Sequence, residues 1–180
     1  AATDELGARH REQVLDGLAS TEDIYRRVRP ATPSMHLVAY VLLVDRDADC
    51  VLLCDHRLAG LWLPTGGHVE PGEDLVDTVR REAMEELGVS ATCDARTGAE
   101  PFFLTVTPTV GDAGGRHVDV SLWFALEAQV GPELRPDAVE FAGVLWWSRR
   151  EVEDADPNLL EPHLVRALDA LALYGSSDSG

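Results

Sequence analysis

Hydrophobic and polar positions follow two patterns along this chain, and each pattern predicts a different kind of element. Short apolar runs bounded by turn residues predict strands. The longest run, residues 35–44, is so uniformly apolar that we expect both of its faces to be buried. A glycine-rich turn at residues 111–115 predicts a hairpin. The expected strands span residues 35–44, 50–54, 102–110, 118–130 and 144–147.

Apolar residues at helical spacing predict the helices. Between Asp74 and Gly88 they occupy one face, with Asp74 suited to the first turn and Gly88 to the C-terminal cap. Residues 158–174 predict an amphipathic helix, and residues 3–29 predict one or two helices that end at a proline-containing linker. In the amphipathic helix, the core-facing residues are expected to be Leu159, Leu160, Leu164, Leu168 and Leu171.

These elements predict one α+β domain with a helical extension in front of it. We expect residues 1–34 to form the extension and linker, residues 35–175 the domain, and residues 176–180 a disordered tail. The extension could serve as a lid, as the arm of a homodimer, or as an addition packed on the domain. Packing on the domain is the favoured interpretation.

Three carboxylates cluster on the helix between Asp74 and Gly88. Glu82, Glu85 and Glu86 are spaced i, i+3 and i+4, so they share a face, and Glu86 borders the apolar stripe. Neighbouring like charges at this spacing cost a few tenths of a kcal/mol per pair. A charged, solvated surface is one explanation of the cluster. A divalent cation explains it better, because Mg²⁺ prefers oxygen ligands.

The chain from Gly67 to Val89 resembles the Nudix box of the Nudix hydrolases. All the polar and glycine positions of that pattern are present, and only Ala83 departs from it, at a position where the family usually has a larger aliphatic residue. The resemblance implies an α/β/α sandwich with a mixed central sheet. The residues at the positions of the pattern, with Ala83 as the departure, are Gly67, Glu73, Arg81, Glu82, Ala83, Glu85, Glu86, Gly88 and Val89.

The resemblance also implies metal-dependent hydrolysis of a nucleoside diphosphate linked to another group. Glu82, Glu85 and Glu86, with the carbonyl of Gly66, would bind Mg²⁺ or Mn²⁺, which neutralise phosphate charge and lower the pKa of water. Glu82 and Glu85 are expected to be catalytic, and the general base would be Glu85 or Glu140. Glu133 and Asp137 are close enough in sequence to replace Glu140.

The remaining box residues are expected to be structural. Glu73 and Arg81 would join the loop to the helix through an ion pair. Gly67 and Gly88 would serve the backbone at the two ends of the motif.

The expected substrate class follows by elimination. Signatures of the family branches that cleave ADP-ribose, diadenosine polyphosphates, coenzyme A and NADH are missing, which favours a nucleoside triphosphate or its oxidised form. Two alternatives stay open: an ADP-ribose or nucleotide-sugar pyrophosphatase, and a non-catalytic nucleotide-sensing module. Candidate substrate contacts are Arg57, Arg116 and Asn158. The favoured role of His117 is that of a hydrogen-bonded strand residue, and that of Trp62, Trp146 and Trp147 is core packing, although one of these rings or Phe103 could stack on a base.

The amino-acid composition limits the classes of partner that we expect this chain to bind. The net charge of −17 argues against duplex nucleic acid and RNA decapping, and leaves a small nucleotide as the expected partner. All 15 basic residues are arginine, so a side-chain contact to phosphate must come from Arg, His or a bound metal. No stretch has the apolar length of a membrane span, and the first ten residues lack the apolar core of a signal peptide. Three cysteines without metal-binding spacing are expected to be buried and reduced, in a cytoplasmic protein.

Overall fold

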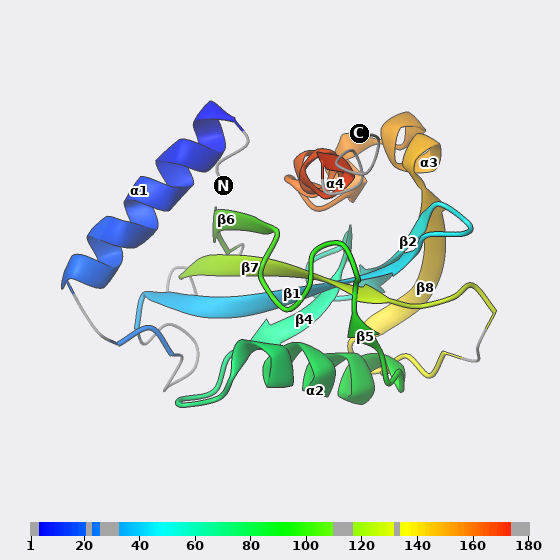
Figure 1. Ribbon diagram of the computed structural model, residues 1–180, viewed down its shortest axis with the longest axis horizontal. Helices are drawn as coiled ribbons and strands as arrows, with labels where there is room; N and C mark the ends of the chain where they lie inside the picture. The colour runs from blue at the N-terminus through cyan, green and yellow to red at the C-terminus, as the bar shows by residue number, and fades with distance from the viewer. Residues whose placement is uncertain (1–3, 21–22, 26–32, 110–116, 132–133, 174–180) are drawn as a thin grey trace.

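The computed structural model describes residues 4–20, 23–25, 33–109, 117–131 and 134–173. Its elements form three layers (Figure 1). A mixed sheet is covered on one side by α2 and on the other by α1, α3 and α4. The α+β class and the α/β/α layering expected from the sequence are confirmed. The helices are α1 (Glu5–Ser20), α2 (Leu75–Leu87), α3 (Arg149–Asp154), the short 3-10 helix η1 (Pro157–Leu159) and α4 (Leu164–Leu173).

Strand β1 is the centre of the sheet. It pairs in parallel with β7 over its whole length, from Met35↔Val118 to Val44↔Glu127. Its other edge pairs with β4 and, near its end, with β2, both antiparallel. Further strands extend β2 and β7 outward. The strands are β1 (Met35–Asp45), β2 (Cys50–His56), β3 (Leu61–Leu63), β4 (Thr65–His68), β5 (Thr92–Cys93), β6 (Phe103–Pro108), β7 (Val118–Glu127) and β8 (Phe141–Ser148).

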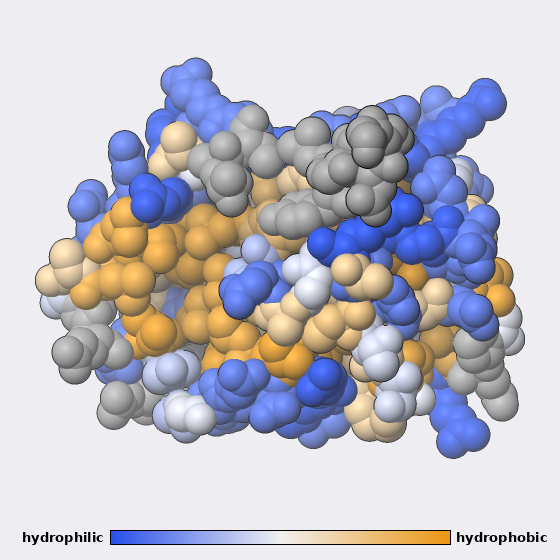
Figure 2. Space-filling view, in the orientation of Figure 1, coloured by the Kyte–Doolittle hydropathy of each residue, from blue (hydrophilic) through white to orange (hydrophobic). Residues whose placement is uncertain are grey.

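Alternate residues of β1 enter two separate cores, which explains its near-continuous apolar run. Leu42 packs on the side of α4, together with the fully buried Trp123. Val41 and Leu43 pack on the side of α2, around Val79 and its neighbours on that helix. Figure 2 shows apolar residues gathered over the left half of the sheet, with hydrophilic residues along α2 below it. The acidic helix therefore has one side in a core and the other in solvent.

The C-terminal helix begins later than the sequence predicts. Residues 158–174 were expected to be one helix, but α4 starts at Leu164. Before it, Leu160 bridges to Trp62 and Glu161 donates its backbone N–H to the Trp62 carbonyl, so this segment is held against β3. Pro162 cannot donate a helical hydrogen bond there. As a result Leu159 lies half exposed instead of in the core, whereas Leu160, Leu164, Leu168 and Leu171 are buried.

Other boundaries also differ from the prediction. Strand β4, which contains the paired glycines Gly66 and Gly67, was not expected, and it pairs with β1. Helix α3 and strand β5 were not expected, although Ser148 and Glu151 form a capping box that marks the start of α3. Strand β8 is longer than residues 144–147, and β7 ends at Glu127 instead of residue 130. The hairpin turn at residues 111–115 and the tail at 176–180 lie outside the described residues.

Helix α1 packs on the domain. Its buried His10 accepts a hydrogen bond from the Val106 backbone N–H on β6. Asp4, just before the helix, forms a two-bond ion pair with Arg166 of α4. Leu15 and Leu18, two of the apolar residues at helical spacing in α1, are about half exposed. The expected second N-terminal helix falls mostly on residues outside the described ranges, and residues 23–25 are not helical.

The cysteines match the expectation only in part. None of the three forms a disulfide bond, but only Cys54 is buried, while Cys50 and Cys93 are partly exposed. No helix within the described residues is both long and apolar enough to cross a bilayer.

Candidate functional site

The ends of α2 are fixed by the residues that the sequence suggested. Asp74 is the N-cap, and its carboxylate accepts the Val76 backbone N–H at 2.8 Å. Gly88 adopts a left-handed conformation, with φ of 68°, and donates its N–H to the last turn of the helix. Between these caps the helix presents Glu82 and Glu86 towards the sheet and Glu85 towards solvent.

Glu82 lies against the glycine pair of β4. A Cβ atom on Gly67 would come within 2.3 Å of the Glu82 Oε1 atom, so only glycine leaves room for this carboxylate. Arg81 donates to the same oxygen at 2.7 Å. Burial raises the pKa of Glu82, and the Arg81 hydrogen bond opposes that shift. The glycine and the arginine together define the position of the carboxylate.

Glu86 is buried beside the start of β4. Its carboxylate accepts hydrogen bonds from the Thr65 hydroxyl and from the Gly66 N–H. Burial raises the pKa of Glu86 to about 7, and the negative charge of Glu140 adds to the effect. Thr65 is a functional neighbour that the sequence did not reveal, because nothing in its local pattern links it to a residue 21 positions away.

Glu73 and Arg81 form the expected ion pair. The guanidinium donates through Nε and Nη2 to the two carboxylate oxygens of Glu73, at 2.8 and 3.0 Å. These hydrogen bonds lower the pKa of Glu73 to about 2. Arg81 also reaches the His68 carbonyl at 3.4 Å, so it connects the loop, the helix and β4.

Glu85 and Glu140 are the two accessible acids of the site. Glu85 has a side chain that is 61% exposed and lies 3.3 Å from Arg81. The carboxylate of Glu140 lies 3.2 Å from His56 Nε2. Its charge contributes to the raised pKa values of Glu82 and Glu86, so the structure brings Glu140 near the acidic face of α2.

The segment before β8 holds Glu140 in this place. Its backbone caps the C-terminal end of α2, since Arg135 and Asp137 donate N–H groups to the carbonyls of Leu87 and Glu86, each at 2.8 Å. Asp137 forms a local turn, in which its carboxylate accepts the Val139 N–H at 2.7 Å. Glu133, the other alternative to Glu140, lies outside the described residues.

Two of the proposed substrate contacts, Arg57 and Asn158, lie within the described residues. Arg57 follows β2 and uses its Nε to bind the Ala138 carbonyl at 3.1 Å, which ties the Glu140 segment to β2. Asn158 lies in η1, and its side-chain amide donates to Asp156, the N-cap residue of η1. Arg116 lies outside the described residues. Phe103 is buried against Trp123, so it is not available for stacking on a base.

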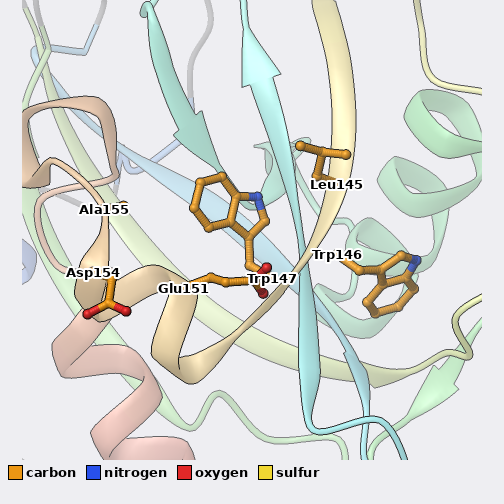
Figure 3. A pocket seen from close by; sticks show the side chains of 6 residues that line it. All are labelled: Leu145, Trp146, Trp147, Glu151, Asp154 and Ala155. Carbon is orange, nitrogen blue, oxygen red and sulfur yellow. The ribbon is translucent and has the colours of Figure 1, made fainter.

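A groove of about 310 Å³ lies at the far end of β8 (Figure 3). Trp147 points to one side of the strand and Trp146 to the other. Trp147 also packs on Trp62, with ring centroids 5.3 Å apart, in agreement with a core role for these rings. Seven residues separate Glu140 from Trp147, roughly 20 Å of extended strand. The groove is therefore not part of the acidic site. It is lined by Leu145, Trp146, Trp147, Glu151, Asp154 and Ala155.

The donors of the acidic site suit a hard cation. Glu82, Glu85 and Glu86 offer carboxylate oxygens from one rigid helix, and Gly66 adds a backbone carbonyl on the strand beside it. Mg²⁺ and Mn²⁺ bind such oxygen sets. Burying two of these acids beside a third costs free energy, and a bound cation would offset that cost. The fold and the site thus define an α/β/α domain in which an acidic helix face lies beside a glycine strand, with oxygen donors suited to a divalent cation.

Comparison with known proteins identifies the family. The model of the NUDIX domain matches residues 35–168, so the chain belongs to the Nudix hydrolase family, whose members act on phosphoric anhydride bonds. The resemblance seen in the box is thereby confirmed.

The individual relatives share 27–47% sequence identity with this chain over the aligned residues. The chain is 28% identical over 134 residues to Nudix hydrolase 19, chloroplastic, of Arabidopsis thaliana, covering 73% of this chain and 27% of that protein. It is 47% identical over 51 residues to the nucleoside triphosphatase NudI of Salmonella schwarzengrund, covering 26% and 36%. A NUDIX family hydrolase structure from Clostridium perfringens aligns with a TM-score of 0.56 and 27% identity, over 77% of this chain and 97% of that one. The chain spans about a quarter to a third of the length of these two curated relatives.

Proposed function

We propose that this protein hydrolyses the pyrophosphate bond of a nucleoside diphosphate linked to another group, with a nucleoside triphosphate or an oxidised form of one as substrate. The observation that carries the proposal is the placement of Glu82 and Glu86 on α2 against the glycine strand β4, with Glu85 exposed beside them. That arrangement combines cation ligands with an open side for a polyphosphate.

Glu82, Glu85, Glu86 and the Gly66 carbonyl would hold Mg²⁺, or Mn²⁺ in its place. When bound, the cation supplies charge neutralisation for the phosphate and an acidified water. The protein itself supplies position: the Arg81 guanidinium and the Gly67 backbone hold Glu82 in place. Thr65 does the same for Glu86.

Glu140 is the proposed proton acceptor. It comes from a loop instead of α2, so it can remain a base while the helix acids bind a cation. His56 is within hydrogen-bonding distance of its carboxylate and can orient it. Arg57 supports the same loop, because its Nε donates to the Ala138 carbonyl. If Glu85 is the base, the loss of Glu140 will matter little.

The triphosphate preference rests on two arguments. Signatures for other substrates are absent from the sequence, and one relative with 47% identity over 51 residues is named a nucleoside triphosphatase. That aligned segment is short, so the experiment must compare substrate classes directly.

A substrate panel tests the proposal. The protein is incubated in Mg²⁺ with canonical and oxidised nucleoside triphosphates, ADP-ribose, nucleotide sugars and a capped dinucleotide, and products are separated by chromatography. We expect a nucleoside monophosphate and pyrophosphate from a triphosphate. Glu85→Gln should be inactive, and Asp77→Asn, an exposed acid on the same helix, should be unaffected. Preferred cleavage of ADP-ribose or a nucleotide sugar would move the assignment to that branch, and binding without cleavage would indicate a sensing module.

A further inference from the structure

Four potential metal ligands meet on the face of the sheet opposite α2. They are His36, His68, His117 and Asp119, and they come from the start of β1, the end of β4 and the start of β7. These three strand ends lie together on the left of Figure 1.

Strand register explains why the four side chains converge. His36 and Asp119 are direct neighbours across the parallel pair β1–β7. His68 pairs with Val38, two residues from His36, and therefore points to the same face. His117 precedes Asp119 by two residues and shares its face by the same alternation.

The distances are close to those of a bound ion. One ligand atom from each residue lies within 4.8 Å of every other. The Asp119 Oδ1 atom is 3.5 Å from His36 Nε2 and 3.2 Å from His117 Nε2. Ligands of a tetrahedral zinc ion, with bonds near 2 Å, are about 3.3 Å apart. Small side-chain rotations would bring all four atoms to that spacing.

The surrounding hydrogen bonds turn the correct ring atoms towards the centre. His36 Nδ1 lies 2.9 Å from the Pro33 carbonyl, which can only accept, so Nδ1 donates there and Nε2 is the ring nitrogen on the side of Asp119. The Thr109 hydroxyl donates to the His117 carbonyl and accepts the His117 backbone N–H, and the same oxygen lies 3.3 Å from His117 Nδ1. Such outer contacts are typical of metal-binding histidines.

Burial and chemistry favour a transition metal here. The side chain of His36 is fully buried, whereas those of His117 and Asp119 are 13% and 21% exposed, which leaves a route for an ion. Three imidazoles and one carboxylate suit Zn²⁺ and disfavour Mg²⁺, which prefers oxygen. The donor set therefore differs in kind from the acidic face of α2.

We propose that His36, His68, His117 and Asp119 form a second metal site, which binds one Zn²⁺ ion and fastens β4, β1 and β7 together. Four protein ligands complete a tetrahedron, as in structural zinc sites. The site supports the catalytic motif from behind, because the His68 carbonyl receives Arg81 while its ring faces the other side of the sheet.

Metal binding can be measured apart from any enzymatic activity. The protein is stripped with a chelator, returned to buffer containing millimolar Mg²⁺ to fill the acidic site, and titrated with Zn²⁺ by calorimetry and with Co²⁺ by visible absorption. We expect one Zn²⁺ per chain, a higher melting temperature, and the intense Co²⁺ bands of four-coordinate geometry.

Variants identify the ligands. Asp119→Ala and His68→Ala should each weaken Zn²⁺ binding by at least ~100-fold, the scale of losses seen on disturbing such sites. His163→Gln, in the turn just before α4, should bind Zn²⁺ as the parent does and serves as the control. His36 is buried, so His117→Ala offers a less disruptive third test. A folded parent protein that binds no Zn²⁺, or variants that bind it equally well, would show that the cluster is only a hydrogen-bonded network.

Discussion

Glu86 is a carboxylate that folding alone disfavours. It is buried, its pKa is raised to about 7, and Glu82 and Glu140 add like charge around it. Glu86→Gln keeps an oxygen that can accept from Thr65 and removes the charge. We therefore expect a melting temperature equal to or above that of the parent in the absence of metal, and a kcat lower by ~100-fold or more. Melting curves recorded with chelator test the expected stability, and turnover at saturating Mg²⁺ tests the expected loss of kcat. Near-parent activity would show that Glu86 is not a ligand.

Glu140 is predicted to accept a proton during the reaction and not to bind the cation. Glu140→Gln should lower kcat by roughly 10²-fold, the range of general-base catalysis, while Mg²⁺ affinity of the free protein stays nearly unchanged. The acidic limb of the pH–rate profile should disappear with it. A loss of less than threefold with the limb retained would return the base role to Glu85. His56→Gln should reproduce part of the defect if the imidazole orients the carboxylate at 3.2 Å.

At the scale of elements, the loop before α2 is joined to the helix by Glu73 and Arg81. The Arg81 hydrogen bonds hold the pKa of Glu73 at about 2, below its ordinary 4.5. This pair stabilises the fold above pH 4.5, and the contribution is lost as pH falls from 4.5 towards 2. Glu73→Gln should cost about 1–3 kcal/mol at neutral pH, with the difference from the parent shrinking in acid. Chemical unfolding at pH 7 and pH 3.5 measures this, and an unchanged neutral curve with lost turnover would make Glu73 catalytic.

Alanine substitutions at the two glycines of β4 are predicted to have different effects. In Gly67→Ala the new Cβ meets the carboxylate at the end of the Glu82 side chain and not the backbone, so the fold should survive while Glu82 is displaced and turnover falls. In Gly66→Ala the Cβ would lie 2.2 Å from the Ala39 carbonyl of β1, and φ is 152°, so the strand pair itself is strained. Melting temperature should separate them, with a large drop only for Gly66→Ala. Equal drops would contradict the assignment of Gly67 to the carboxylate.

The elements that the sequence predicted best are those determined by residues close together in the chain. Asp74, Gly88 and the apolar stripe of α2 lie within one short stretch, so caps and spacing could be read directly. The start of α4 was wrong because a long-range contact of Leu160 with β3 overrides helical spacing. The histidine cluster could not be predicted from spacing, since its members come from three strands that meet only in the folded sheet.

At the scale of the molecule, α1 is held to α4 by groups that respond to pH. His10 and His163 stack edge to face at 5.3 Å beside Arg166. Burial and Arg166 lower the pKa of His163 to about 4, and the same causes lower the pKa of His10. The contact is therefore strongest above pH 6.5 and weakens as pH falls towards 4, because the released form binds protons more readily.

Hydrogen exchange can test this pH dependence. After correction for intrinsic rates, amides of α1 should lose protection at pH 5 relative to pH 7.5, while those of β1 and β7 should not. His163→Gln should reduce the difference, since one titrating group is gone. Equal protection of α1 at both pH values would exclude control by these histidines.

The parallel pairing of β1 with β7 also sets an order of events during synthesis. Residues 46–117, which include β4 and the acidic helix α2, must leave the ribosome before β1 can meet its partner. At typical translation speeds this takes roughly 4 to 14 s. During that interval the nascent chain has no completed sheet against which α2 can bury its apolar face. We therefore expect newly made α2 to be a segment that chaperones recognise, and the protein to acquire its acidic site only after translation has passed β7.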